Sequence, residues 1–176
     1  MKKILLLFAV VICITSCDVI DDLTQFNMDF EEEVVIPASS VVNLPFTINT
    51  PQMTTNSEST FEVNDTRKDL VEEIKLTKLT LTLTNPVDGN FNFLTDIEVF
   101  IAADGLADMK IAWKENIAND GTVFLELDTT NEDIKEYIKK DEFSLQLTTT
   151  TDELISSDHY ITVNSTFFVD AKILGV

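Results

Sequence analysis

The chain has 176 residues, 44% of them hydrophobic, and a formal net charge of −19 from 31 acidic and 12 basic residues. This charge argues against a nucleic-acid partner, whose phosphates attract basic surfaces, and against electrostatic adhesion to anionic lipid. The length is sufficient for one domain with a proper hydrophobic core.

The first residues have the order of a secretory signal. Lys2 and Lys3 form a short positive n-region, and an apolar run follows over residues 4–14. At about 1.5 Å per residue, this run covers roughly half of the ~30 Å hydrocarbon core of a bilayer. We therefore predict a signal-peptide h-region and not a transmembrane helix.

The segment that follows reads Ile14-Thr15-Ser16-Cys17 and resembles the lipobox of bacterial lipoproteins. The resemblance implies cleavage between Ser16 and Cys17, a diacylglycerol thioether on the Cys17 sulfur, and an acyl chain such as palmitate on the new amino group. Two or three chains hold a protein far more firmly than one, at ~0.8 kcal/mol per buried CH₂. We therefore expect membrane attachment through acyl chains on Cys17.

An acidic tether is expected over residues 17–24, because Asp18, Asp21 and Asp22 closely follow the cysteine. This segment is similar to the export signal of Bacteroidota lipoproteins that reach the cell surface, and the chain resembles small outer-membrane lipoproteins of that group. A solvated spacer has the same composition. The expected localisation is the outer membrane, with the periplasmic and the surface leaflet both left open.

Cleavage after residue 16 would leave 160 residues and a net charge of −21, because Lys2 and Lys3 are lost with the signal. Cys13 leaves with the signal and Cys17 is used by lipid, so no thiol remains for a disulfide, a metal or nucleophilic catalysis. The domain over residues 25–176 must then be held together by its hydrophobic core.

Alternation of apolar and polar residues with period two predicts strands along this domain. The expected strands cover residues 25–36, 41–48, 75–84, 96–102, 109–113, 122–128, 142–151 and 161–173. Three adjacent glutamates at 31–33 require an exposed edge, a bulge or a turn, and Pro45 indicates an edge strand or a bulge. The last strand has the longest alternation and is expected to be central.

Two short helices interrupt the strands. Asp65 or Thr66 can cap one over residues 67–74. Thr130 and Asp133 resemble a capping box for a second helix, whose expected apolar residues are Ile134, Tyr137 and Ile138.

These elements predict an all-β fold, an antiparallel β-sandwich of Ig-like or jelly-roll type with one or two short helices. The expected organisation is a signal peptide at 1–16, a lipidated cysteine and tether at 17–24, and one domain at 25–176. Phe91 and Phe93 are expected to plug one end of its core.

The sequence offers little that could perform catalysis. His159 is the only histidine, no Gly-x-Ser-x-Gly motif surrounds a serine, and His159 is interpreted as a surface residue. Acidic groups near residues 18–22, 128–133 and 152–158 leave a calcium-binding site open as an alternative, but none of these segments matches an EF-hand loop. We therefore expect no metal, no cofactor and no catalytic residue.

The aromatic composition is typical of a core, with twelve phenylalanines but one tryptophan and two tyrosines. Trp113 alternates with Ile111 and is expected in the core or at a sheet end. Phe100 and Phe168 fall on faces that otherwise point outward, so those faces are either covered or available to a partner.

The sequence predicts a lipid-anchored, non-catalytic envelope lipoprotein that displays a binding or assembly module for an unknown protein or glycan. The alternatives are a carbohydrate-active enzyme that uses paired carboxylates, and a calcium- or carbohydrate-binding module. The oligomeric state is left open.

Overall fold

The structure is a computed structural model that describes residues 24–38 and 45–172. Ser16 and Cys17, the predicted cleavage and lipidation residues, lie outside the described residues. The strands are β1 (Phe26–Ile36), β2 (Pro45–Asn49), β3 (Met53–Thr54), β4 (Val71–Asn85), β5 (Leu94–Ala102), β6 (Met109–Lys114), β7 (Phe124–Glu126), β8 (Asp128–Thr129), β9 (Glu142–Thr151) and β10 (His159–Ala171). The helices within these residues are α3 (Ser57–Val63) and α4 (Lys135–Ile138).

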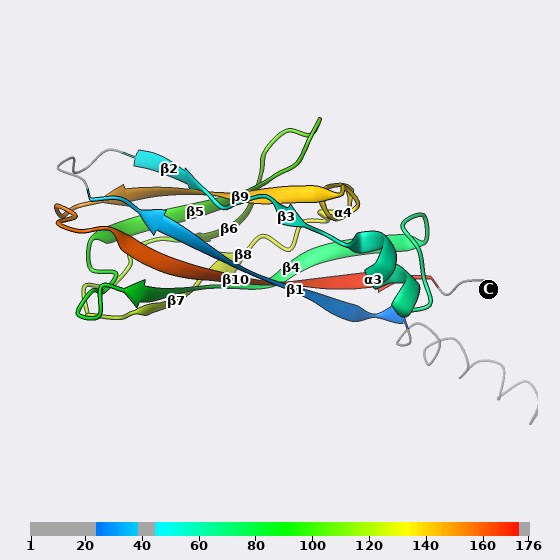
Figure 1. The fold of residues 1–176 in the computed structure, drawn as a ribbon, viewed down its shortest axis with the longest axis horizontal. Helices are drawn as coiled ribbons and strands as arrows, with labels where there is room; N and C mark the ends of the chain where they lie inside the picture. The colour runs from blue at the N-terminus through cyan, green and yellow to red at the C-terminus, as the bar shows by residue number, and fades with distance from the viewer. Residues whose placement is uncertain (1–23, 39–44, 173–176) are drawn as a thin grey trace, which may run out of the picture.

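The strands form two antiparallel sheets that pack face to face, one above the other in Figure 1. One sheet has the order β1-β10-β4-β7, and the other has the order β2-β9-β5-β6-β8, with β3 also paired to β9. The eight main strands therefore pair as nested couples, namely β1 with β10, β2 with β9, β4 with β7, and β5 with β6. This nesting is the jelly-roll arrangement, so the predicted sandwich is confirmed in its jelly-roll form.

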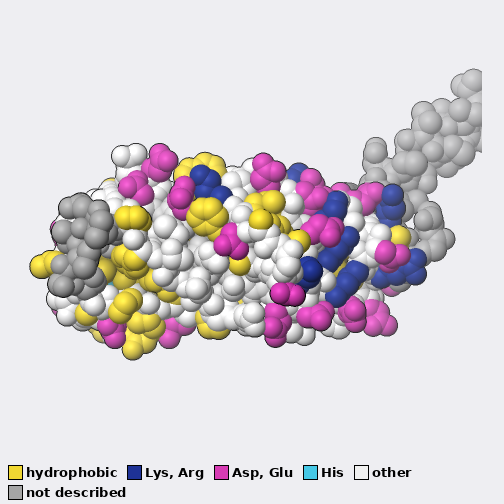
Figure 2. All heavy atoms as spheres, turned by 90° about the horizontal axis from the view of Figure 1, so that it is seen from above, with side chains coloured by type: hydrophobic (Ala, Val, Ile, Leu, Met, Phe, Trp, Pro, Cys, Tyr) yellow, Lys and Arg dark blue, Asp and Glu magenta, His cyan; other side chains and the backbone are white. Residues whose placement is uncertain are grey.

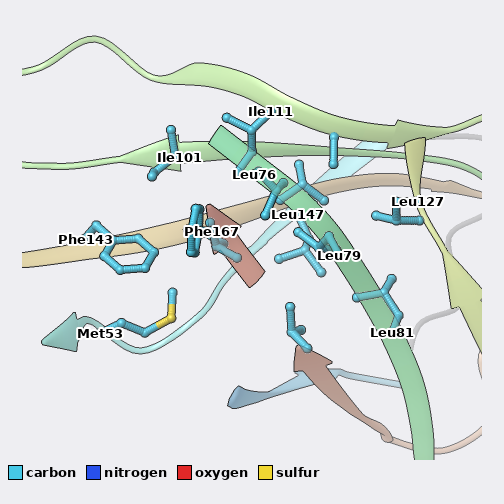
Figure 3. Packing of buried hydrophobic residues seen from close by; sticks show 14 of the residues in the cluster. Met53, Leu76, Leu79, Leu81, Ile101, Ile111, Leu127, Phe143, Leu147 and Phe167 are labelled. Carbon is cyan, nitrogen blue, oxygen red and sulfur yellow. The ribbon is translucent and has the colours of Figure 1, made fainter. Parts of the chain in front are cut away.

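The core lies between the sheets and contains mainly aliphatic residues and phenylalanine (Figure 3). Phe30, Phe143 and Phe167 meet edge to face, with ring centroids 5.1 to 5.7 Å apart. They come from β1, β9 and β10, so this trio joins the two sheets, and each such pair contributes about 0.5–1.5 kcal/mol beyond burial. Phe91 and Phe93 are buried, which confirms that they close one end of the core.

The three glutamates at 31–33 lie in β1, an edge strand whose register with β10 continues without a bulge. Glu31 and Glu33 face outward, whereas Glu32 lies half-buried on the same side of β1 as Met28 and Val34. A charge that points inward on an edge strand opposes pairing with the edge of another sheet. Of the predicted alternatives, an exposed edge is the one formed.

Pro45 is the first residue of β2, which is an edge strand of the second sheet. This position needs no ladder hydrogen bond from the missing N–H. β10 lies between β1 and β4, so the prediction that the last strand is central is also confirmed.

The predicted helix over residues 67–74 is wrong. The helix lies earlier, in α3, where Phe61 is buried, and β4 already begins at Val71. The register of β4 with β10 shifts twice in this region, so Val71, Ile74, Leu76 and Leu79 are all buried despite their uneven spacing. The two bulges change the spacing of the buried residues in this strand, so that its sequence pattern resembles that of a helix.

The second predicted helix is confirmed as α4, but its capping box is not formed. The Thr130 hydroxyl accepts the N–H of Glu132 at 3.4 Å, and no side chain caps the first turn from the N-cap position. Instead, Asp133 Oδ1 accepts the N–H groups of Ile74 and Lys135, both at 3.1 Å. Asp133 thus attaches the start of α4 to β4, because its carboxylate accepts N–H groups from both elements.

Burial opposes ionisation of the Asp133 carboxylate, but hydrogen bonds from the Lys135 ammonium and from two backbone N–H groups outweigh it. The pKa of Asp133 therefore lies below its ordinary value of 3.8. A lowered carboxylate pKa stabilises the fold above that value and ceases to do so as the pH falls through the native pKa.

We predict that Asp133→Asn lowers the free energy of unfolding at pH 7 by about 0.5–1.5 kcal/mol, because a charge-assisted contact is lost. The difference from the wild type should shrink as the pH falls below 3.8. Urea unfolding at several pH values measures both effects. Asp69→Asn is the control, since Asp69 forms an exposed ion pair with Arg67 and its substitution should change stability little. An equal loss in both variants would contradict the role of Asp133.

We predict that Glu31→Thr/Glu32→Val/Glu33→Thr increases self-association, because the free edge of β1 loses its charges. Sedimentation velocity over a range of concentrations should show larger species than for the wild type. The control is Glu62→Thr/Asp104→Thr/Asp108→Thr, which removes the same charge from exposed residues outside the strands. Association of both variants to the same extent would indicate a simple net-charge effect.

Candidate functional site

The outer face of the second sheet carries two neighbouring rows of side chains that cross its strands. The register places Trp113 of β6 opposite Glu98 of β5, and places Lys110 opposite Phe100. Trp113 and Phe100 are therefore diagonal neighbours across the two strands. Figure 2 views the molecule from the side of this sheet and shows hydrophobic side chains among charged ones and white surface. We call this surface the aromatic face.

The same rows continue across β9 and β2 with hydrogen-bonding side chains. The full rows are Thr47, Thr148, Glu98, Trp113 and Asp128, and beside them Asn49, Gln146, Phe100 and Lys110. The hydroxyls of Thr47 and Thr148 lie 3.0 Å apart, and Asn49 is exposed. Two half-buried aromatic rings are thus flanked by hydroxyl and amide groups on one accessible surface.

A β-bulge places Trp113 on this face. The register between β5 and β6 shifts between Val99 and Phe100, and it leaves Ile111 as the extra residue. Ile111 and Ala112 are both buried, so the alternation slips by one and Trp113 lies half-buried on the outer side. Of the two expected places for Trp113, the core is therefore wrong, and the residue lies near the end of β6. A bulge cannot be inferred from simple alternation with Ile111.

Lys110 joins the charged and aromatic parts of the face. Its Nζ lies 3.1 Å from Glu98 Oε1 and 5.9 Å from the centre of the Trp113 ring. The Lys110 and Glu98 side chains are 43% and 47% exposed, so the contact is worth little to stability and can be exchanged for a ligand. This cluster supplies a cation, an anion and an aromatic surface at one place.

The two carboxylates nearest to Trp113 on the aromatic face are accessible to solvent. Glu98 and Asp128 flank Trp113 on the two neighbouring strands, which puts them roughly two strand spacings, about 9.5 Å, apart. Glu98 is held by Lys110, and Asp128 is exposed. Two solvated carboxylates of this kind lack the enclosed, water-poor surroundings in which a general acid works.

A shallow depression beside α3 contains a second pair of carboxylates. Lys68 Nζ lies 3.6 Å from Glu58 Oε1 and 3.4 Å from Asp141 Oδ1, and all three side chains line the depression. Both carboxylates are almost fully exposed. The lysine between them serves as their common counter-ion.

His159 is buried, so its interpretation as a surface residue is wrong. Its ring packs against Phe93, with centroids 4.7 Å apart, and its Nδ1 lies 2.8 Å from the Ser157 carbonyl oxygen. The neighbouring Asp158 carboxylate accepts the N–H of Ala38 at 2.8 Å. The alternation of β10 places the imidazole in the core, where it fills the end of the sandwich.

The acidic groups for which a calcium site was left open do not form such a site among the described residues. Within residues 24–38 and 45–172, no three His, Cys, Asp or Glu side chains are placed to hold a metal ion. The Asp133 carboxylate instead accepts a hydrogen bond from β4 and so holds α4 to this strand. The acidic residues at 18–22 lie outside the described residues. No helix among the described residues is long and apolar enough to cross a membrane.

The two phenylalanines expected on outward faces lie on opposite sides of the molecule. Phe100 belongs to the aromatic face, whereas Phe168 is half-buried on the outer side of the first sheet, between Asn27 and Lys75 of the neighbouring strands. Alternation alone could find Phe100, Gln146 and the threonines of the aromatic face. It could not show that they form one row with Trp113.

No protein-family model and no curated protein matches this chain. Among solved structures, the chain is similar to the capsid asymmetric unit of cyanophage Pam1, with 9% identity, a TM-score of 0.43, and coverage of 82% of this chain and 85% of that one. It is also similar to CpGH89CBM32-5 from Clostridium perfringens, in complex with GalNAc-β-1,3-galactose, with 12% identity, a TM-score of 0.37, and coverage of 82% and 97%.

A further similar structure is one of the carbohydrate-binding modules from the β-sandwich superfamily. It has 10% identity and a TM-score of 0.30, and the match covers 85% of this chain and 56% of that one. The ligands of these structures are properties of those proteins.

Proposed function

We propose that this protein is a lipid-anchored, non-catalytic lipoprotein of the outer membrane whose aromatic face binds a glycan. The single observation that carries the glycan part is the placement of Trp113 and Phe100 on the diagonal, beside Thr148 and Gln146. Sugar rings present C–H groups on one side and hydroxyls at their edges. An aromatic surface bordered by amides and hydroxyls complements both.

The spacing of the two rings favours an oligosaccharide over a single sugar. Trp113 and Phe100 lie on neighbouring strands at diagonal positions, so each can contact a different ring of the ligand. Thr47, Thr148, Asn49 and Gln146 extend the polar part of the face across β9 and β2. Affinity should therefore increase with the number of sugar units until the face is covered.

The anchor is supported by the order of Lys2, Lys3, the apolar run and Cys17 in the sequence. Thr24, the first described residue, lies at the end of the sandwich where β10 ends, and its hydroxyl donates a hydrogen bond to the Ala171 carbonyl. The aromatic face lies along the side of the molecule (Figure 1). Attachment at that end would leave this face accessible.

The second candidate function is a glycan hydrolase, and the carboxylates of Glu98 and Asp128 on either side of Trp113 favour it. The solvent exposure of both carboxylates and the ion pair of Glu98 with Lys110 favour binding without cleavage. Release of reducing ends from a bound oligosaccharide by the wild type, lost in Glu98→Gln, would favour the hydrolase.

We predict that Trp113→Ala weakens binding of glycan-array hits by about tenfold or more, because a stacked aromatic contact is worth on the order of 1–2 kcal/mol. Phe100→Ala should have a smaller effect in the same direction. Calorimetry with each hit measures the affinity, and thermal unfolding checks that the variants remain folded.

The matched controls are Tyr160→Ala and Phe168→Ala, which remove half-buried aromatic side chains from the outer side of the other sheet. Both should bind as the wild type does. The absence of any array hit, or equal losses in all four variants, would contradict glycan binding by the aromatic face.

We predict that Cys17→Ser moves the protein from the membrane fraction to the soluble fraction, because serine has no sulfur to form the thioether that carries the diacylglycerol. Mass spectrometry of the wild type from the membrane fraction should find an N-terminus at Cys17 with two or three acyl chains. Cys13→Ser is the control and should remain on the membrane. An N-terminus before Cys17, without acyl mass, would disprove the anchor.

A further inference from the structure

One end of the sandwich exposes aliphatic side chains at the tips of its loops. We define the loop end as residues 86–93, 115–123 and 152–158, the connections at the left of Figure 1. Val87 is 97% exposed and Leu154 is 64% exposed, and Val123 with the adjoining Phe124 is about half exposed. Four large apolar side chains at one end are an unusual exposure in a chain that buries most of its aliphatic residues.

The loops that carry these side chains are held firmly to one another. Phe91 N–H donates to the Thr122 carbonyl at 2.9 Å, and Gly121 N–H donates to Asn92 Oδ1 at 2.8 Å. Asp152 N–H donates to the Phe93 carbonyl at 3.2 Å. All three connections are therefore linked by hydrogen bonds, above the buried rings of Phe91 and Phe93.

The base of the loop end is also closely packed. A Cβ atom at Gly89 would lie 2.7 Å from Leu83 Cδ2, so the connection from β4 to β5 lies directly on the end of the core. Val87 remains exposed on this fixed base. The apolar tips are thus presented in a defined geometry, which lowers the entropy lost when a partner binds.

The charge of the loop end is of one sign. The three segments contain no lysine or arginine, and their acidic residues are Asp88, Glu115, Asp120, Asp152, Glu153 and Asp158. Asp88 and Glu153 directly adjoin Val87 and Leu154. The basic residues lie mainly toward the opposite end, near α3, α4 and the adjoining strand ends, at Arg67, Lys68, Lys75, Lys135, Lys139, Lys140 and Lys172. Figure 2 shows dark-blue side chains gathered toward one end of the molecule.

We propose that the loop end docks a partner protein whose contact surface has an apolar centre and a rim of lysine and arginine. Acidic residues beside Val87 and Leu154 complement such a rim and would guide the encounter. The same charges oppose anionic lipid and nucleic acid. Phe124 is the single aromatic side chain among the four exposed apolar ones, so this end offers a sugar less stacking surface than the aromatic face does. A second copy of the chain fits this surface less well. Its own loop end is acidic and would be repelled, and its charges near α3 are already paired with one another.

The proposal is tested by photo-crosslinking in the native cell, with benzoylphenylalanine in place of Val87 or, separately, of Leu154. The matched control carries it in place of Val63, which is 79% exposed near the other end. Both loop-end positions should give an adduct with the same protein, and Val63 should not. That protein is then purified and its affinity for the full chain measured.

Val87→Ser/Leu154→Ser should weaken this affinity by about tenfold or more, because these side chains form the apolar centre. Asp88→Asn/Glu153→Gln should reduce the association rate and its dependence on salt. Both pairs are exposed, so thermal unfolding should remain unchanged. Trp113→Ala should bind the partner normally, which separates this surface from the aromatic face.

Several results would overturn the proposal. They are an adduct with lipid, with glycan or with a second copy of the chain, equal adducts from Val63, or no adduct at all. An unchanged affinity of the Val87→Ser/Leu154→Ser variant would do the same. None of these outcomes bears on glycan binding by the aromatic face or on lipidation of Cys17.

Discussion

The antiparallel pairing of β10 with β4 is the interaction on which the rest of the sandwich depends. These are the two longest strands, and they lie side by side at the centre of the first sheet. Every second residue of β10 is buried, from His159 to Ala171, so the pair forms one side of the core. β1 is then added to the free edge of β10, and α4 is attached to β4 through Asp133.

The nested pairing of the jelly roll joins strands that are far apart in the sequence. β1 pairs with β10 and β2 pairs with β9, so both sheets need the C-terminal part of the chain before they can form. Neither cysteine lies among the described residues, so the interior contributes burial and ring contacts such as Phe30 with Phe143 and Phe167. Stability therefore rests on the packing between the sheets.

The same architecture separates three surfaces. The aromatic face lies along the outer side of the second sheet, the loop end gathers connections from both sheets, and β1 leaves a charged edge on the first sheet. Each surface uses positions that the core does not need. A glycan at Trp113 and a protein at Val87 would occupy different surfaces, because Trp113 lies on the outer side of the second sheet and Val87 lies in a connection between strands.

The sequence by itself determined the strands with clean alternation, such as β9 and β10, the central place of β10, and the class of the fold, because period two reports directly on two-sided burial. It also predicted the short helix at Ile134 and the outward face of Phe100. Tertiary structure decided the features that depend on bulges. Register shifts made a strand of residues 71–74 and turned Trp113 outward. Pairing with Ile36 of β1 extended β10 to His159, so that the alternation of this strand buries the imidazole. Such shifts arise from the fit between strands that are distant in the chain, which local periodicity does not record.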